Sequence, residues 1–188
     1  MMKNLVQIIR ESTALAGHLR RDERGVSAVE FALLLPLMLT MYLGTVEVSQ
    51  GIGASRKLSL TTRAVADLVS QVSSINNADM TNSLNAAATV MAPYSSSKLK
   101  VVVSSVTIDS TGKATVAWSE QLNGTARAKG STITLPTALN IPNSSLIFSE
   151  VQYDYKPTIG YIISGTISLK DQIYMRPRLS DQVTRVNS

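Results

Sequence analysis

The chain has 188 residues and a net charge of +5, with no cysteine and a single histidine, His18. This length allows one membrane anchor and one globular domain with a modest core, and the absence of cysteine excludes disulfide bonds and thiolate metal sites. The basic residues beyond residue 25 are scattered, whereas nucleic-acid-binding surfaces are normally clustered. We therefore expect no nucleic-acid partner, and neither a metal nor another cofactor.

An apolar stretch from Phe31 to Val46 begins directly after a lone acid, Glu30. Its sixteen residues, at about 1.5 Å each, make about 24 Å of helix, which is less than a hydrocarbon core of about 30 Å. Adding residues 26–29 makes the helix long enough, so we predict a membrane helix over residues 26–48 that includes Glu30. A charged side chain inside a membrane span is costly and usually marks a partner or a pathway.

Residues 1–25 form a basic leader before this helix, and three interpretations of the segment stay open. A cleaved secretory signal has a basic start and an apolar middle, but it gains nothing from Glu30. A plain signal anchor tolerates Glu30 as a residue near the membrane surface. A third kind of signal is cut after Gly25 on the cytoplasmic side and leaves the apolar helix on the mature protein.

The apolar stripe of the span continues into residues 49–73. Its members recur at spacings of three and four, which is typical of one face of a helix. They are Leu58, Thr61, Val65, Leu68 and Val72. Residues 74–77 then break the pattern. We therefore predict one long helix, with its first part in lipid and its second part against a folded head of residues 74–188.

A second, shorter helix is predicted from about Met80 to Met91. Asn77 or Asp79 is a suitable cap at its amino-terminal end. Pro93 stops the helix, because proline cannot donate a backbone hydrogen bond.

The rest of the head is rich in strand-forming residues. Residues 109–112 have turn chemistry and lie between two strand-like segments, which predicts a hairpin. Residues 122–144 are predicted to form a loop with a short strand at 132–135. The other expected strands are residues 100–108, 114–121 and 146–156, and a last strand whose odd face carries Ile163, Ile167, Leu169, Ile173 and Met175. Helices followed by an antiparallel sheet indicate an α+β fold.

The segment around the span resembles a known family. Arg24-Gly25 is followed by Ala28-Val29-Glu30-Phe31-Ala32, by Pro36, and by Gly44-Thr45-Val46-Glu47. This order resembles the amino-terminal signature of the TadE/TadG-like pilins of the tight-adherence (Tad) pilus system. Gly25 with Glu30 and Phe31 is also similar to the prepilin-peptidase motif of the major pilins of these systems. Residues 56–58, 62–68, 151–157 and 174–178 are similar to later parts of the family.

The resemblance implies a pilin-like fold and a role as a minor pilin or pilus-assembly pseudopilin. Its expected place is the bacterial inner membrane, with a cytoplasmic amino terminus and a periplasmic head. The partners that it implies are other pilin and pseudopilin subunits, the prepilin peptidase, the Tad inner-membrane assembly platform and the lipid bilayer. An uncleaved, membrane-anchored periplasmic scaffold is the alternative.

The resemblance also assigns roles to residues at the start of the helix. Gly25, Val26, Glu30 and Phe31 form the candidate processing site. In related pilins the acid is thought to pair with the new amino terminus of a neighbouring subunit, which here is the amine of Val26. An ammonium and a carboxylate attract strongly at low dielectric, and either one unpaired is costly.

Further residues of the helix are candidates for packing and assembly. Pro36 is expected to kink the helix, although a harmless membrane proline is nearly as compatible with the sequence. Small residues at intervals of four, seven and four place one stripe on a single face, which suits close helix packing. The candidate assembly residues are Glu30, Pro36, Thr40, Gly44, Glu47, Gly51 and Ser55.

An enzymatic function is the third class of interpretation, as a tethered hydrolase. Glu120, Glu150, Asp154 and Asp171 are acids that would supply a catalytic pair. No spacing favours a pair among them, and the chain has neither a nucleophile elbow nor a phosphate-binding glycine loop. We expect these acids to be solvated surface, Trp118, Tyr153 and Tyr155 to be sheet core, and the protein not to be an enzyme.

Overall fold

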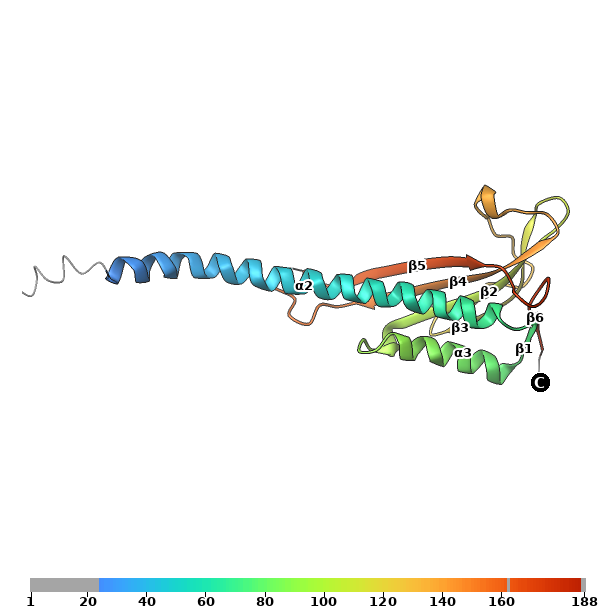
Figure 1. Cartoon of the computed structure of the whole chain (residues 1–188), viewed down its shortest axis with the longest axis horizontal. Coiled ribbons are helices and arrows are strands. Elements are labelled where there is room, and N and C mark those ends of the chain that lie inside the picture. The colour runs from blue at the N-terminus through green and yellow to red at the C-terminus, as the bar shows by residue number, and fades with distance from the viewer. Residues whose placement is uncertain (1–23, 162, 187–188) are drawn as a thin grey trace, which may run out of the picture. The chain divides into compact units, whose positions relative to one another are not determined.

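The computed structural model describes residues 24–161 and 163–186 of the chain. His18 and the other residues 1–23 of the predicted leader lie outside the described residues. The chain divides into two compact units, one ending at Val46 and the other beginning at Glu47. Helix α2 (Arg24–Ser70) contributes residues to both units (Figure 1).

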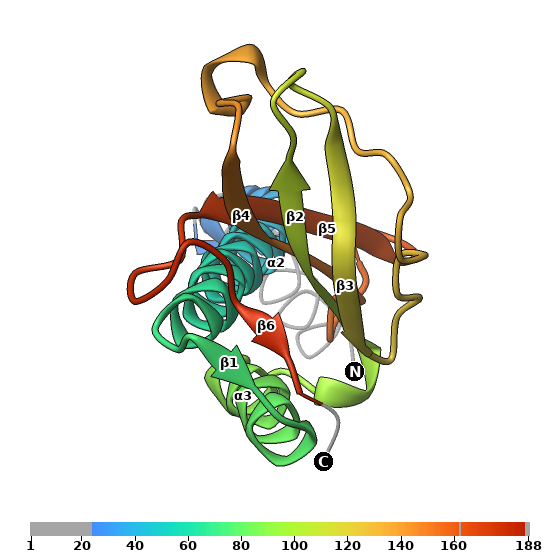
Figure 2. The same ribbon diagram turned by 90° about the vertical axis from the view of Figure 1, so that its right-hand side faces the viewer.

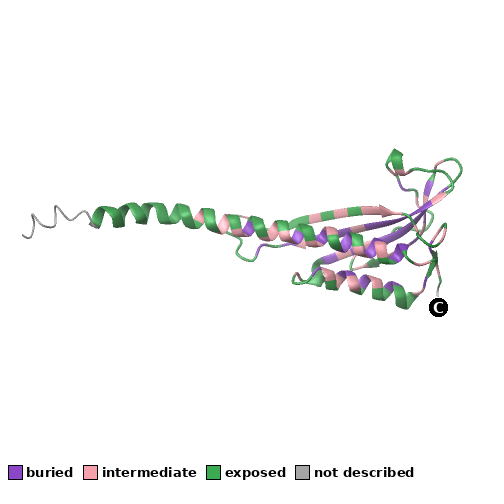
Figure 3. Ribbon diagram, in the orientation of Figure 1, coloured by how far each residue is buried: buried purple, intermediate pink, exposed green. Residues whose placement is uncertain are grey.

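In the first unit, α2 is apolar and exposed around its circumference (Figure 3). Leu33, Met41 and Tyr42 are 74%, 67% and 66% exposed. The helix is long and apolar enough to cross a membrane, because residues 25–46 alone extend about 33 Å at about 1.5 Å per residue. The long helix predicted from the sequence is confirmed.

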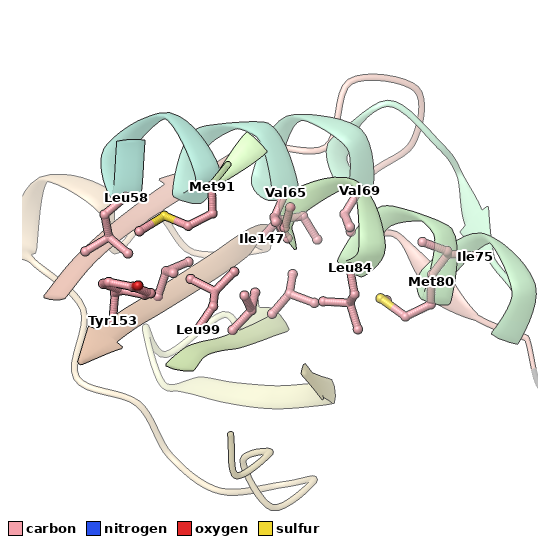
Figure 4. Packing of buried hydrophobic residues seen from close by; sticks show 14 of the residues in the cluster. Leu58, Val65, Val69, Ile75, Met80, Leu84, Met91, Leu99, Ile147 and Tyr153 are labelled. Carbon is pink, nitrogen blue, oxygen red and sulfur yellow. The ribbon is translucent and has the colours of Figure 1, made fainter. Parts of the chain in front are cut away.

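The second unit packs two helices against one face of a sheet (Figures 1 and 2). Its part of α2 buries Leu58, Val65 and Val69, and α3 (Asn77–Val90) buries Met80 and Leu84 beside them. Met91, just after α3, is also part of this core (Figure 4). Leu58, Thr61 and Val65 of the predicted stripe therefore face the core, whereas Leu68 is 39% exposed and Val69 is buried in its place.

The cap of α3 differs from the prediction. Asn76 is the N-cap, and its side chain accepts a hydrogen bond from the backbone N–H of Asp79 at 2.8 Å. Neither Asn77 nor Asp79 is the cap, because Asn76 has the extended backbone that a cap requires and Asn77 is already the first helical residue.

The sheet of the second unit has four antiparallel strands in the order β3-β2-β4-β5. They are β2 (Leu99–Ile108), β3 (Ala114–Leu122), β4 (Ser144–Tyr155) and β5 (Ile167–Met175). The hairpin predicted around residues 109–112 is confirmed as β2 and β3. Together the helices and this sheet confirm the predicted α+β class.

The start of the last strand is a correction. The strand was expected to include Ile163, but β5 begins at Ile167. Gly165 lies between them with a φ of +99°, a conformation that interrupts an extended strand. The backbone N–H of Ile163 instead donates to the side chain of Glu47.

A second hydrophobic cluster lies on the opposite face of the sheet, toward one end. Val106, Leu146 and Phe148 point to this face and are covered by Ile133. No strand is formed at residues 132–135, where one was predicted. This segment instead makes a single bridge between Thr115 and Thr132, with a few backbone hydrogen bonds to β3 beside it. Proline at 136 cannot donate to a ladder, which limits how far this pairing extends.

A short parallel pair, β1 (Ser74–Ile75) and β6 (Thr184–Arg185), was not predicted. Arg185 ties it to its surroundings by donating to the carboxylate of Glu120 at 2.9 Å and to the backbone carbonyl of Ile75 at 3.1 Å. Nearby, the indole N–H of Trp118 donates to the carbonyl of Val183 at 2.7 Å. The carboxy-terminal segment is thereby fixed to the core. A short turn of 3-10 helix, Ser96–Lys98, precedes β2, and another, Thr137–Leu139, lies in the loop before β4.

Candidate functional site

The candidate processing bond, between Gly25 and Val26, lies in the first turn of α2, which begins at Arg24. A Cβ added to Gly25 would meet no atom within 4 Å, and Val26 and Phe31 are 58% and 60% exposed. A protease needs such access to the backbone.

Glu30 lies one turn farther along and is exposed. It has no hydrogen-bond or ion-pair partner among the described residues. A carboxylate in an apolar helix that has no partner among the described residues is available to a partner from another molecule.

Glu47 is an acid on the same helix with the opposite environment. It is fully buried, and its two carboxylate oxygens accept backbone N–H groups from Tyr161 at 2.6 Å and Ile163 at 2.8 Å. Hydrogen bonds to a charged acceptor are about twice as strong as neutral ones, which offsets the cost of burying the charge. Gly160, with a φ of +68°, provides the turn that directs these N–H groups toward Glu47.

The contact between Glu47 and this loop joins residues 114 and 116 positions apart. The sequence analysis placed Glu47 among the candidates for assembly and did not identify the loop as its partner. The sequence did contain a sign of this loop. Gly160 and Gly165 flank a short apolar segment that does not continue the alternation of apolar and polar residues in β5. That signal predicts a turn but does not say what the turn binds.

The predicted stripe of small residues has mixed surroundings. The Thr40 hydroxyl donates to the carbonyl of Pro36 at 2.8 Å, within the helix. A Cβ on Gly51 would lie 3.7 Å from Tyr155, so this glycine faces the sheet of its own unit. Ser55 is exposed and Gly44 half-buried. Packing of the stripe against another subunit stays a prediction.

The start of α2 in the second unit is also fixed by aromatic side chains. The Tyr94 hydroxyl donates to the carbonyl of Gln50 at 3.1 Å, and the Tyr94 ring meets the rings of Tyr153 and Tyr155 edge-on at 6.1 and 6.3 Å. Burial raises the pKa of both Tyr153 and Tyr155. These two tyrosines and Trp118 are core residues, as predicted.

Three of the four acids considered for a catalytic pair lie in separate ion pairs. Glu150 accepts two hydrogen bonds of 2.7 Å from Arg127, which raise the pKa of the guanidinium. Asp154 accepts one of 3.0 Å from Lys100, which lowers the pKa of that carboxyl. Lys100, Arg127 and Glu150 border an open hollow of about 810 Å³ on the outer face of the sheet.

Glu120 pairs with Arg185, and Asp171 accepts the N–H of its neighbour Gln172 at 2.9 Å. Within residues 24–161 and 163–186, no three His, Cys, Asp or Glu side chains gather as metal ligands. The chemistry of these contacts is that of solvated surface pairs.

Comparison with known families identifies the segment of the chain that carries the family resemblance. Residues 25–67 match the family described as TadE-like protein. This part of the chain is TadE-like. The TadE-like segment starts at the candidate processing glycine, contains both Glu30 and Glu47, and ends three residues before α2 does. The resemblance is thus confirmed for the helix, whereas residues 151–157 and 174–178 lie outside the match. No curated protein and no solved structure matches the chain significantly.

Proposed function

We propose that this chain is a TadE-like minor pilin of a Tad-type pilus. In this proposal α2 crosses the inner membrane once, with the amino terminus in the cytoplasm and the head in the periplasm. A prepilin peptidase cuts after Gly25. The helix and the head then contribute to pilus assembly as structural, non-enzymatic elements, in contact with other pilin subunits and with the inner-membrane assembly platform.

The observation that carries the proposal is the position and surroundings of Glu30. It is the fifth residue after Gly25, it is exposed, and it has no partner among the described residues. Cleavage after Gly25 creates a free ammonium on Val26. In a neighbouring subunit this ammonium would pair with Glu30 at low dielectric, where both charges are costly when unpaired.

Such a pair would also set the register between neighbouring helices. The helix from residue 31 to residue 46 offers mainly apolar surface, such as Leu33 and Met41, and apolar surface alone permits many axial offsets in a membrane. A single charged pair is satisfied at one offset only. The acid would therefore determine the position at which each subunit docks.

The test compares charge-removing and charge-keeping variants of Glu30 in cells that lack their own copy. Glu30→Ala and Glu30→Gln should greatly reduce the number of surface pili counted by electron microscopy, whereas Glu30→Asp should retain part of it. Leu33→Ala, one turn away and 74% exposed in the parent, is the matched control and should leave pili intact. Immunoblots of the membrane fraction show whether each variant is present.

If Glu30→Ala left pilus number unchanged while the protein stayed abundant, the pairing role would be wrong. An uncleaved scaffold predicts that result, because a scaffold that is not incorporated has no neighbouring ammonium to bind.

A further inference from the structure

The loop between β4 and β5, residues 156–166, exposes apolar side chains near its tip. Ile159 is 47% exposed and Tyr161 is 62% exposed. Lys156 at the start of the loop is exposed as well. An isoleucine, a tyrosine and a lysine are the residue types that bind the surface of a bilayer, where the tyrosine ring lies among the headgroups.

The loop is held at one defined point of the helix. Two backbone N–H groups of this loop, those of Tyr161 and Ile163, donate to the carboxylate of Glu47, which belongs to the same unit. Glu47 directly follows Val46 in the sequence, the last residue of the apolar segment. The headgroup layer is about 5–7 Å thick on each side of the hydrocarbon core, so a loop bonded to Glu47 would lie within that layer.

The helix itself remains apolar just beyond this point. Val48 and Ile52 are 49% and 51% exposed, although they belong to the folded unit. With Ile159 and Tyr161 they give the membrane-proximal part of the head four exposed apolar side chains, continuous in sequence with the span on the helical side.

We propose that this loop is a second membrane contact of the protein, in which Ile159 and Tyr161 enter the headgroup layer while Glu47 holds the loop to the helix. The inference rests on the proposed membrane anchoring by α2. It gives the buried acid a purpose, because Glu47 fixes the loop at the end of the apolar segment. The contact would restrict how far the head tilts from the membrane surface.

The lipid surface fits this patch better than a second protein does. A stable protein interface buries about 800 Å² on each partner, which is more than four partly exposed side chains supply. Lys156 complements the negative charge of anionic headgroups. A second copy of the chain is the competing occupant, and the experiment below separates the two.

The experiment uses the full chain in nanodiscs of phosphatidylcholine and phosphatidylglycerol that hold one chain each. Because the chain has no cysteine, a single Ile159→Cys variant can be labelled with an environment-sensitive fluorophore. Leu179→Cys is the matched control, because Leu179 is 72% exposed but lies far from Glu47. It follows Arg178, whose backbone N–H donates to the carbonyl of Ser70, the last residue of α2. Emission from Trp118 reports whether each variant is folded.

We expect the label at position 159 to emit at shorter wavelength and to be quenched by a lipid-attached nitroxide. The label at 179 should respond to aqueous iodide instead. Adding Glu47→Ala to Ile159→Cys should return the label at 159 to water while Trp118 stays buried.

Two results would overturn the inference. In the first, the label at 159 is in water although the chain remains in the nanodisc, which leaves the proposed membrane anchoring intact. In the second, the label is shielded only in discs that hold two chains, which assigns the patch to a second copy. If the chain does not enter nanodiscs at all, the anchoring and the proposed function fail with it.

Discussion

Glu30 and Glu47 are the same residue type on the same helix, yet their surroundings are opposite. Glu30 is exposed in an apolar segment and has no partner among the described residues. Glu47 is fully buried and accepts two backbone N–H groups from a loop. The difference teaches that an acid in an apolar helix has two uses. One holds its own chain together, and the other is left available to a partner.

The two parts of α2 show the same contrast in their apolar residues. In the first unit, leucines point outward on all sides, as Leu33 does at 74% exposure. In the second unit they separate into a buried face with Leu58 and an exposed face with Leu60. Among the described residues, burial within the chain therefore stabilises the second part, whereas the proposed contacts with lipid and other subunits would stabilise the first.

The largest effect that tests this contrast is expected from Leu58→Ala. Leu58 is 1% exposed in the main core, and removing a buried leucine side chain costs about 2–5 kcal/mol of unfolding free energy. Leu60 lies two residues away and is 55% exposed, so Leu60→Ala should change the unfolding free energy by less than about 0.5 kcal/mol. Urea unfolding of the full chain in detergent, followed by Trp118 emission, measures both. Equal effects would contradict the assignment of the buried face.

Exchanging each acid for its amide should separate their roles. Glu47→Gln keeps one acceptor oxygen but turns an NH₂ group toward the loop, so one N–H loses its acceptor at a cost of about 1–3 kcal/mol. Glu30→Gln should leave the urea midpoint unchanged, since Glu30 has no partner among the described residues. If Glu30→Gln destabilised the head, or if Glu47→Gln left its stability unchanged, the roles assigned to the two acids would be wrong.

Two glycines at the start of the second unit should respond in opposite directions to alanine. Gly51→Ala places a methyl 3.7 Å from Tyr155, an ordinary contact, and should stabilise the helix by about 0.5–1 kcal/mol. Gly53→Ala places it 3.0 Å from the Tyr94 hydroxyl, which is held by its bond to Gln50, and should destabilise. Urea midpoints of the two variants give the sign. A gain in both would show that Tyr94 is free to move.

The smallest effect concerns pH and the surface of the sheet. The hydrogen bond from Lys100 lowers the pKa of Asp154 below its ordinary value of 3.8. Ionised Asp154 therefore stabilises the folded state. This contribution is fully present above the pKa that Asp154 has in the unfolded chain, and it is lost as the pH falls through the lower pKa of the folded state. Asp154→Asn should have a slightly lower urea midpoint than the parent at pH 6 and the same one well below pH 3.8. High salt should reduce the difference at pH 6.

Much of the fold was predictable where it depends on local patterns. Helical spacing identified the buried face of α2 from Leu58 to Val65, and the turn residues from Asp109 to Gly112 identified the hairpin. Asp109 shows why that turn is local: its carboxylate accepts N–H groups from Thr111 and Lys113. Such signals lie within a few residues of one another.

The rest depends on contacts between distant residues. The strands β1 and β6 have two residues each and lie about 110 positions apart in the sequence. Two residues are too few to produce a recognisable strand pattern. The partner of Glu47 likewise comes from a loop far along the chain. For the candidate site, the sequence therefore indicated which acids are candidates. The structure was needed to show that Glu47 is bonded to a loop of its own unit and that Glu30 has no such bond among the described residues.

The most direct test of the central claim is the amino-terminal sequence of the membrane-bound protein, purified from cells with and without the prepilin peptidase. Processing after Gly25 predicts a chain that begins at Val26 when the peptidase is present and keeps its leader when it is absent. Recovery of Met1 or Met2 under both conditions would contradict the account.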